Sequence, residues 1–352
     1  MPFLRNAWYA AGWASELGEQ PLARTLLDEP IVLYRDTAGE PVALADQCPH
    51  RFAPLSLGQV DGDRIRCPYH GLVFDKTGAC AHNPHGKGAR PASLSVRHYP
   101  TAVQNGLIWI WMGDTVAARD VRPPDYPFLD RADWGPLTGY LHVAANYELV
   151  TDNLMDLSHT EFLHPFIAPE GTAAAIRYRA EQDGDRIAAL HAMPDQPNTP
   201  LFQLMMGDDV KRIDGHANTY WEAPSNMLLE AYAIALDTGD GRRADLPTVH
   251  LLTPESETGT HYFWGVARNA AVGDTRVDEM LFAGISHAFE QEDEPMIRAV
   301  QARMRGRSLF DLSPALLPMD EAAVRVRRTL AKRIAAEQAA GQALAAAAIV
   351  AE

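Results

Sequence analysis

The chain has 352 residues, 47% of them hydrophobic and 22% charged, and its formal net charge is −15. This length predicts two domains, each able to bury its own core. The acidic balance, with no basic cluster longer than R-V-R-R at 325–328, excludes nucleic acid and anionic membranes as partners. No apolar run approaches the ~20 residues that span a bilayer, so we expect a cytoplasmic protein.

The first third of the sequence consists of short β-like runs separated by turn residues, which predicts an all-β domain. Strands are expected at 31–34, 41–45, 72–75 and 107–111. Residues 113–136 are rich in Asp, Arg and Pro and have the composition of a linker. We therefore predict a first domain at 1–120 and a second at 121–352.

Two of the three cysteines lie beside histidines. The motifs are C-P-H-R at 48–51 and C-P-Y-H-G at 67–71, and the third cysteine is Cys80. Three cysteines are too few for a disulfide framework, so the pattern indicates a metal. Two thiolates and two imidazoles can hold a tetrahedral zinc, or a [2Fe–2S] cluster in which two histidines replace two cysteines on one iron. We favour the cluster because the Cys and His of C-x-H are too closely spaced to bind one ion easily. In a cluster, each loop can give its Cys to one iron and its His to the other.

A polar stretch early in the second domain reads N-L-M-D-L-S-H-T-E-F-L-H at 153–164. Asp152 or Asn153 is expected to cap a helix whose polar face carries Asp156 and His159. Taken alone, this pattern is explained by an amphipathic helix with hydrogen-bonded polar residues. A downstream carboxylate and the upstream Cys/His motifs favour a metal site instead.

The second histidine of this stretch, His164, lies ~140° round an ideal helix from His159. Pro165 disfavours α geometry at His164, so the helix should end there and let that imidazole swing back. Two histidines and one carboxylate form the facial triad of oxygen-activating non-haem Fe(II) enzymes.

The rest of the second domain is expected to form an antiparallel sheet with one face lining a cavity. Its predicted strands lie at 187–193, 226–236, 248–255 and 260–268. His250 alternates with apolar neighbours and could point into this cavity and contact a substrate, although a lone strand histidine is more often structural. A helix at 288–301 carries an acidic cluster, and a last helix is expected from about Asp320. The acidic residues are Glu290, Glu292, Asp293 and Glu294, and spacing alone does not choose among them.

The two Cys/His motifs resemble those of the Rieske family. The resemblance implies that Cys48 and Cys67 bind one iron of a [2Fe–2S] cluster, while His50 and His70 bind the other. Cys80 has no partner in this scheme and is expected to be a packing or loop residue. The neighbouring His82 and His85 are expected to be ordinary loop histidines.

The whole chain is similar to the oxygenase component of the vanillate and dicamba O-demethylase group, sharing H-N-P-H-G-K-G-A-R-P, D-N-L-M-D-L-S-H and L-T-P-E-S-E-T. This resemblance implies an α+β fold. An N-terminal all-β Rieske [2Fe-2S] domain would precede a helix-grip catalytic domain, in which helices flank an antiparallel sheet. It also implies a head-to-tail homotrimer.

The group pattern of an aromatic residue, an acidic pair ending in Asp and an aliphatic pair points to Asp293 as the third metal ligand. The implied site is therefore a mononuclear Fe(II) at His159, His164 and Asp293, with Asn153 and Asp156 as catalytic residues beside it. Asp156 would bridge the His70-type cluster ligand of one subunit to the His159-type ligand of the next.

The implied activity is that of a monooxygenase. A separate reductase or ferredoxin would deliver NADH-derived electrons, and O₂ would hydroxylate a methoxy carbon so that formaldehyde leaves. The group binds dicamba-type substrates through an Asn, a His and a Trp; here His250 matches the His, while Leu229 and Gly284 replace the others. We therefore prefer a methoxybenzoate-like aromatic acid without insisting on vanillate.

Two other readings stand beside this one. The same architecture could hydroxylate an aryl methyl group or a ring, or remove an N-methyl group. A non-enzymatic Rieske electron carrier or a zinc-stapled binding protein would have no use for the long second domain.

Overall fold

The computed structural model describes residues 3–351, with 344–351 described by their backbone alone. The chain forms two compact units: one runs to Asp125 and also takes Thr253–Ser256, and the other holds the remainder. The first boundary lies inside the Asp-, Arg- and Pro-rich stretch at 113–136. None of the helices in the described range has the length and hydrophobicity to span a bilayer.

The first unit is built from three antiparallel sheets with strand orders β1-β11-β10, β2-β3-β4-β9 and β5-β6-β7-β8. The strands are β1 (Trp8–Trp13), β2 (Leu22–Leu26), β3 (Glu29–Arg35), β4 (Pro41–Ala45), β5 (Gln59–Asp61), β6 (Arg64–Arg66), β7 (Val73–Asp75), β8 (Cys80–His82), β9 (His98–Tyr99), β10 (Thr101–Gln104) and β11 (Leu107–Trp111). The four strands predicted from the sequence are confirmed as β3, β4, β7 and β11. The first Cys/His motif precedes β5, and the second joins β6 to β7.

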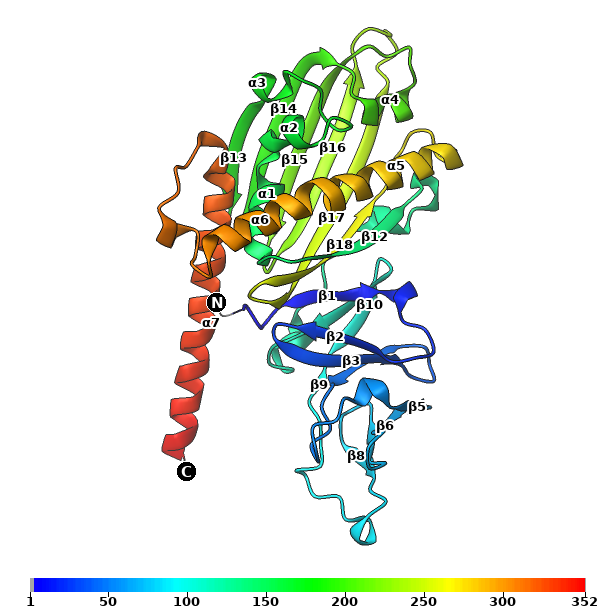
Figure 1. The fold of residues 1–352 in the computed structure, drawn as a ribbon, viewed down its shortest axis with the longest axis vertical. Coiled ribbons are helices and arrows are strands. Elements are labelled where there is room, and N and C mark those ends of the chain that lie inside the picture. The colour runs from blue at the N-terminus through cyan, green and yellow to red at the C-terminus, as the bar shows by residue number, and fades with distance from the viewer. Residues whose placement is uncertain (1–2, 352) are drawn as a thin grey trace. The chain divides into compact units, whose positions relative to one another are not determined.

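The second unit is organised around one seven-stranded antiparallel sheet of order β12-β18-β17-β16-β15-β14-β13. The strands are β12 (Leu137–Val143), β13 (Arg177–Asp183), β14 (Arg186–Pro197), β15 (Arg212–Glu222), β16 (Asn226–Ala235), β17 (Arg243–Ser256) and β18 (Gly259–Val266). The four predicted strands are confirmed as β14, β16, β17 and β18. Helices α1, α2, α5 and α6 lie over one face of this sheet (Figure 1).

The α-helices are α1 (Tyr147–Met155), α2 (Thr160–Leu163), α3 (Thr172–Ala175), α4 (Pro200–Met206), α5 (Thr275–His287), α6 (Glu294–Met304) and α7 (Glu321–Ala351), and a π-helical segment, Ala288–Asp293, joins α5 to α6. The 3-10 turns are Ala14–Glu16, Leu55–Leu57, Gly86–Gly88, Ala117–Asp120, Pro127–Asp130, Ala132–Trp134, Leu157–His159, Phe310–Leu312 and Pro318–Asp320. The predicted last helix is confirmed as α7, which packs against α1, β13 and β14.

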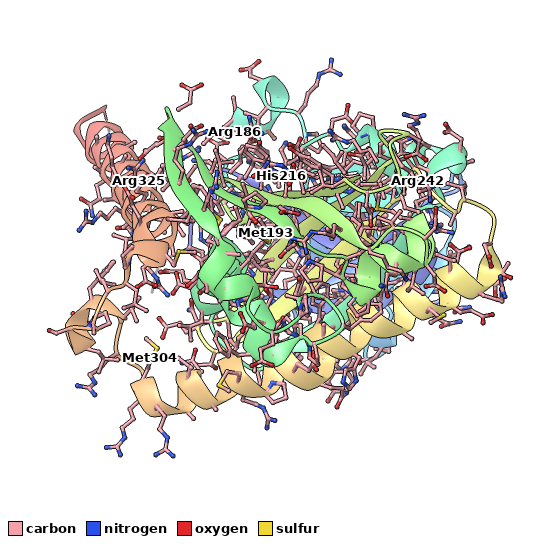
Figure 2. The ribbon with its side chains drawn as sticks, turned by 90° about the horizontal axis from the view of Figure 1, so that it is seen from above. Arg186, Met193, His216, Arg242, Met304 and Arg325 are labelled. Atoms are coloured by element: carbon pink, nitrogen blue, oxygen red, sulfur yellow. The ribbon has the colours of Figure 1, made fainter. Side chains whose placement is uncertain are left out.

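The helix-facing side of the sheet is hollow at its centre because the central strands carry small residues there. Ala217 of β15 pairs with Ala231 of β16, and His191 of β14 lies opposite Ala217. Side chains alternate between faces along a strand, so Met193 shares the face of His191, and Figure 2 labels Met193 on the helix side of the sheet. Small side chains at the centre leave room for a ligand.

Candidate metal centres and active site

The two Cys/His loops of the first unit share one backbone hydrogen-bond pattern. In each loop the cysteine N–H donates to the carbonyl five residues later, and the cysteine carbonyl accepts from the N–H four residues later. The bonds are Cys48 N–H to Ala53 O (2.9 Å), Phe52 N–H to Cys48 O (2.8 Å), Cys67 N–H to Leu72 O (2.8 Å) and Gly71 N–H to Cys67 O (3.2 Å). Phe52 and Gly71 both have positive φ, 58° and 72°. The loops are two copies of one turn.

These turns bring the four motif side chains together. Cys48 and Cys67 are buried in the hydrophobic core of the unit, while the rings of His50 and His70 lie 4.5 Å apart, centroid to centroid. Burial raises the pKa of the Cys48 thiol to about 11, with Cys67 adding to the rise against backbone N–H bonds that lower it. Two neighbouring buried thiols of this kind become thiolates by binding a metal.

The spacing of the donor atoms separates a cluster from a single zinc. Ligand atoms around one tetrahedral zinc lie about 3.5 Å apart, given Zn–S and Zn–N distances near 2.3 and 2.1 Å. Among the described residues, no three of these four side chains bring their donor atoms within 4.8 Å of one another. The arrangement therefore fits the two irons of a [2Fe–2S] cluster.

The neighbouring cysteine and histidines differ in their contacts. Cys80 packs against the core around Cys48, as predicted, and His82 is exposed. His85, however, donates from Nε2 to the His70 carbonyl at 2.8 Å. His85 thus holds the second loop in place, a role beyond that of the ordinary loop histidine predicted from the sequence.

In the second unit, the predicted helix start is wrong. Helix α1 begins at Tyr147, and Asn146 caps it by accepting from the Glu148 N–H at 2.9 Å. The helix breaks at Asp156 (φ −124°, ψ 98°), whose side chain caps the next turn by accepting from the Ser158 N–H. Asp156 and His159 therefore do not share one helix face.

The predicted helix end at His164 is confirmed. His164 is the C-cap of α2 with φ −124° and ψ 72°, outside the α region that a following proline disfavours. This turn carries its imidazole inward, where 2% of the residue remains exposed.

Each of the two histidines has its Nδ1 committed to a hydrogen bond. His159 Nδ1–H donates to the Asp156 carbonyl at 2.7 Å, and His164 Nδ1–H donates to the Glu292 carboxylate at 2.7 Å. In the neutral ring, Nε2 is then a bare lone pair. Such partners fix the tautomer and orientation of metal-binding histidines.

The two lone pairs converge on the Asp293 carboxylate. His159 Nε2 and His164 Nε2 lie 3.5 and 3.2 Å from Asp293 Oδ1, and Asn153 Nδ2 donates to the same oxygen at 3.0 Å. The three donor atoms lie within 4.8 Å of one another. Two imidazoles and one carboxylate are the donor set of a facial-triad Fe(II) site, so these residues fit the predicted iron.

Asp293 reaches the site because the helix carrying it is not regular. The Glu294 N–H donates to the Phe289 carbonyl, five residues back, which is the π-helical register. Pro295 explains the break, since a proline inside a helix has no N–H and clashes with the preceding turn. The predicted helix at 288–301 is therefore part of a longer α5–π–α6 rod.

A buried ion-pair network holds α1 in place. Arg327 of α7 donates to both carboxylate oxygens of Asp152, at 2.6 to 3.0 Å, and pairs with Glu148. Burial raises the pKa of Asp152 to about 6, while Arg327 acts to lower it. Asp152 therefore serves this network and is not a helix cap.

A cavity of about 140 Å³ opens beside the triad and is lined by His159, His164 and Asp293. His250 also lines it and is 2% exposed, and its contact with a substrate stays a prediction. The cavity walls are mostly apolar, as in most small-molecule sites. The arrangement can hold an aromatic molecule next to an iron.

The two positions that depart from the dicamba-type pattern have different surroundings. Leu229 lines it and offers no hydrogen bond. A Cβ added to Gly284 would lie 2.4 Å from the ring of Phe166, so Phe166 occupies the space of a larger side chain at 284. Of these two positions, Leu229 is the one that lines the cavity.

Comparison with protein-family models gives two matches. Residues 7–100 match the Rieske [2Fe-2S] domain, and residues 143–336 match the vanillate O-demethylase oxygenase C-terminal domain. The chain belongs to the vanillate O-demethylase oxygenase family of Rieske enzymes. This membership excludes the non-enzymatic carrier and the zinc-stapled binding protein.

The similarity to known proteins extends along nearly the whole chain. The oxygenase component of dicamba O-demethylase from Stenotrophomonas maltophilia is 39% identical over 94% of this chain and 98% of that protein. The oxygenase component of chloroacetanilide N-alkylformylase from Rhizorhabdus wittichii is also 39% identical, over 95% of this chain and 97% of that protein. A crystal structure of dicamba monooxygenase bound to 3,6-dichlorosalicylic acid has a TM-score of 0.90 and 38% identity, covering 96% of this chain and 100% of that one. The predicted α+β fold is confirmed.

The residues that orient the triad could not be recognised from the sequence in these roles. Glu292 and Arg327 act through hydrogen bonds to His164 and Asp152, and only Pro295, which marks the irregular turn, was a local signal. His191, which also lines the cavity, carried no signal at all.

Proposed function

We propose that this protein is the terminal oxygenase of a multicomponent Rieske monooxygenase that O-demethylates a methoxy-substituted aromatic compound. The observation that carries the proposal is the convergence of two Nε2 lone pairs and the Asp293 carboxylate beside an apolar cavity. The proposed ligands of the [2Fe–2S] cluster are Cys48, His50, Cys67 and His70, and those of Fe(II) are His159, His164 and Asp293.

When bound, the iron supplies activation of O₂ with two electrons, and the overall reaction converts the aryl methyl ether, O₂, two electrons and two protons into a phenol, formaldehyde and water. Hydroxylation of the methoxy carbon gives a hemiacetal that breaks its C–O bond to release formaldehyde. A separate reductase or ferredoxin would supply the electrons from NADH. Dependence on NADH is consistent with a location in the cytoplasm.

The chain's own residues position the reactants. Asn153 donates to Asp293 and fixes that carboxylate. Glu292 and the Asp156 carbonyl hold the two imidazoles with Nε2 facing inward. Apolar side chains such as Leu229 and Phe289 keep water from the reacting carbon.

Asp156 is proposed to connect His159 to the His70 of a neighbouring copy in a homotrimer. Its Oδ1 accepts from Ser158, whereas Oδ2 has no hydrogen-bond partner among the described residues. A second cavity, lined by Asp156 and His159, is rimmed by Met296 and Leu316, which are 50% and 51% exposed. Exposed apolar side chains around a free carboxylate oxygen suit a docking surface.

We expect Asp156→Asn to retain both metals but to slow electron arrival at the iron severely. Single-turnover O₂ consumption by the pre-reduced protein measures this. An unchanged rate would rule out the bridging role, and a lower melting temperature with an unchanged rate would make Asp156 a purely structural cap.

The test of the proposed function is formaldehyde release from a panel of methoxyarenes, with a surrogate reductase and NADH. Ring- or methyl-hydroxylated products without formaldehyde would favour the alternative oxygenase activities. N-dealkylation is the second candidate, because the relative named as an N-alkylformylase is as similar to this chain as the dicamba enzyme, at 39% each. An N-methylanilide in the panel separates these two.

A further inference from the structure

The loop that follows β8, residues 83–90, supports one of the two Cys/His turns at its histidine. From this contact we infer that His85 is a positioning residue for the cluster: it fixes His70, the ligand proposed to pass the electron on, and keeps the reduction potential low. This role rests on the proposed function, because it requires the proposed [2Fe–2S] cluster.

The two turns carry their histidines at different positions. Counted from the cysteine that opens each turn, His50 is the third residue of the first turn. The third residue of the second turn is Tyr69, and His70 is the fourth. The first-turn residue that matches His70 is therefore Arg51, which is exposed while His70 is half-buried. The turns share one backbone pattern, but they do not hold their ligands in the same way.

His85 supports the second turn at the residue that carries the ligand. Its Nε2 lies 2.8 Å from the His70 carbonyl oxygen, and a carbonyl can only accept, so the ring nitrogen carries the proton and donates. Among the described residues, the matching Arg51 carbonyl has no hydrogen-bond partner. The backbone bonds within each turn fix its cysteine, and the second turn gains a further bond at its histidine.

The residue before His85 contacts the same turn. A Cβ built on Gly71 would lie 3.5 Å from Cγ of Pro84, so the proline ring lies over the position that follows His70. Two neighbouring residues of the 83–90 loop therefore meet two neighbouring residues of the turn. Any movement of the His70 backbone has to disturb both contacts.

The 83–90 loop is itself held in shape by side-chain bonds. Asn83 Oδ1 accepts from the His85 N–H at 3.0 Å, and Asn83 Nδ2 donates to the Ala89 carbonyl at 2.6 Å. Arg90 donates to the Ala81 carbonyl at 2.8 Å, which ties the end of the loop to β8. Since β8 pairs with β7, the strand that follows the second turn, the support and the turn are joined at both ends.

Other rings complete the surroundings of His70. The Tyr69 ring lies 3.9 Å from it and the His50 ring 4.5 Å, centroid to centroid. His50 remains exposed, whereas these contacts leave His70 half-buried. Without the bond from His85, the backbone at His70 could shift, and water would reach more of its ring.

Access of water matters because of the charge on the cluster. Two thiolates and two imidazoles leave a [2Fe–2S] cluster uncharged when oxidised and with one negative charge when reduced, so water stabilises the reduced form more. Hydrogen bonding and solvent exposure are among the factors that set the potentials of iron–sulfur clusters. By holding His70 half-buried, His85 keeps the potential low, which favours passing the electron on to the iron.

The test is a redox titration of the cluster-loaded protein, followed by its visible spectrum. In His85→Leu we expect the reduction equilibrium to change by about threefold towards the reduced form, which is a rise of about 28 mV for one electron. The electron paramagnetic resonance spectrum of the reduced protein should change as well, because it depends on how the histidine ligands are oriented. Neither measurement requires turnover.

Three further variants tie the shift to the hydrogen bond. His85→Gln keeps a neutral N–H donor at a similar reach and should restore the wild-type potential. Asn83→Ala removes both bonds that shape the loop and should reproduce the rise, so it decides where His85→Leu does not retain the cluster. His82→Leu, the same substitution at an exposed histidine of β8, should change nothing, because its side chain has no hydrogen-bond partner among the described residues.

An unchanged or lower potential in His85→Leu would overturn the role of His85, as would an equal rise in His82→Leu. A lower melting temperature with an unchanged potential would make His85 a purely structural residue. All of these results would leave the proposed oxygenase function intact. Absence of a [2Fe–2S] spectrum from the wild-type protein loaded with iron and sulfide would instead contradict the proposed function itself.

Discussion

The two candidate metal sites of this protein are assembled in opposite ways. In the first unit, each Cys/His loop fixes its own cysteine through backbone bonds to residues four and five positions later. In the second unit, His159 and His164 lie near each other in the chain but Asp293 comes from a distant part of it, and the three are oriented by groups on several elements. A site made of self-contained turns depends little on distant packing, whereas the triad depends on how α1 and α5–α6 are held.

The largest expected effect separates the two sites completely. His159→Ala should lose the mononuclear iron and lower turnover by roughly a thousandfold or more, while the visible spectrum of the cluster stays unchanged. Iron content, spectrum and formaldehyde release measure this. Full activity in the variant would refute the triad assignment.

A distant residue should also affect the triad alone. Arg327→Met leaves Asp152 and Glu148 buried without their counter-ion and should lower the unfolding free energy of the second unit by about 3–5 kcal/mol. Urea titration measures this, and the mononuclear iron should be lost at a lower urea concentration than in the wild type. Arg325→Met is the control on the same helix, since its pair with Glu321 is partly exposed and should be worth under about 1 kcal/mol. If Arg327→Met lost the cluster together with the iron, the two sites would not depend on distant packing to different degrees.

A smaller effect is expected from the group behind one ligand. Glu292→Gln should weaken iron binding by about 10–100-fold, because the carboxylate that orients His164 and increases its basicity is lost. Competition with a chelator measures the affinity. Glu290→Gln, at an exposed position two residues earlier, should leave it unchanged, and equal affinities in both variants would remove Glu292 from the site.

The smallest effect should come from the cluster loops. A Cβ at Gly71 would find its nearest atom, Cγ of Pro84, at 3.5 Å, so there is room for alanine. Gly71→Ala should therefore cost only about 1 kcal/mol for the positive φ, with the cluster spectrum retained, as Phe52 at the matching position suggests. Loss of the cluster would show that the loop is less self-contained than its bonds indicate.

The sequence predicted best what depends on neighbours in the chain. The Cys/His motifs, the short strands and the helix end before Pro165 all follow from local chemistry, and the structure has them where expected. The choice of Asp293 among four acidic residues needed the family resemblance.

What depends on tertiary contacts could not be predicted. Asp152 is as good a cap residue as Asn146 by type, but Arg327, far along the chain, takes its carboxylate. Which ring nitrogen bears the proton depends on the Tyr262 hydroxyl for His250 and on the Ala217 carbonyl for His191. Strand register places both of these partners. No pattern within β14 or β17 reveals which nitrogen bears the proton.

The π-helical segment Ala288–Asp293 has a consequence for which changes of length the chain can tolerate. A π turn contains one residue more than the α-helix it interrupts. Deleting one residue here, such as Gln291, would remove the wide turn and restore a regular helix. Glu292 and Asp293 could then no longer both face His164. This stretch should accept substitutions at its exposed positions far more readily than the loss of a single codon.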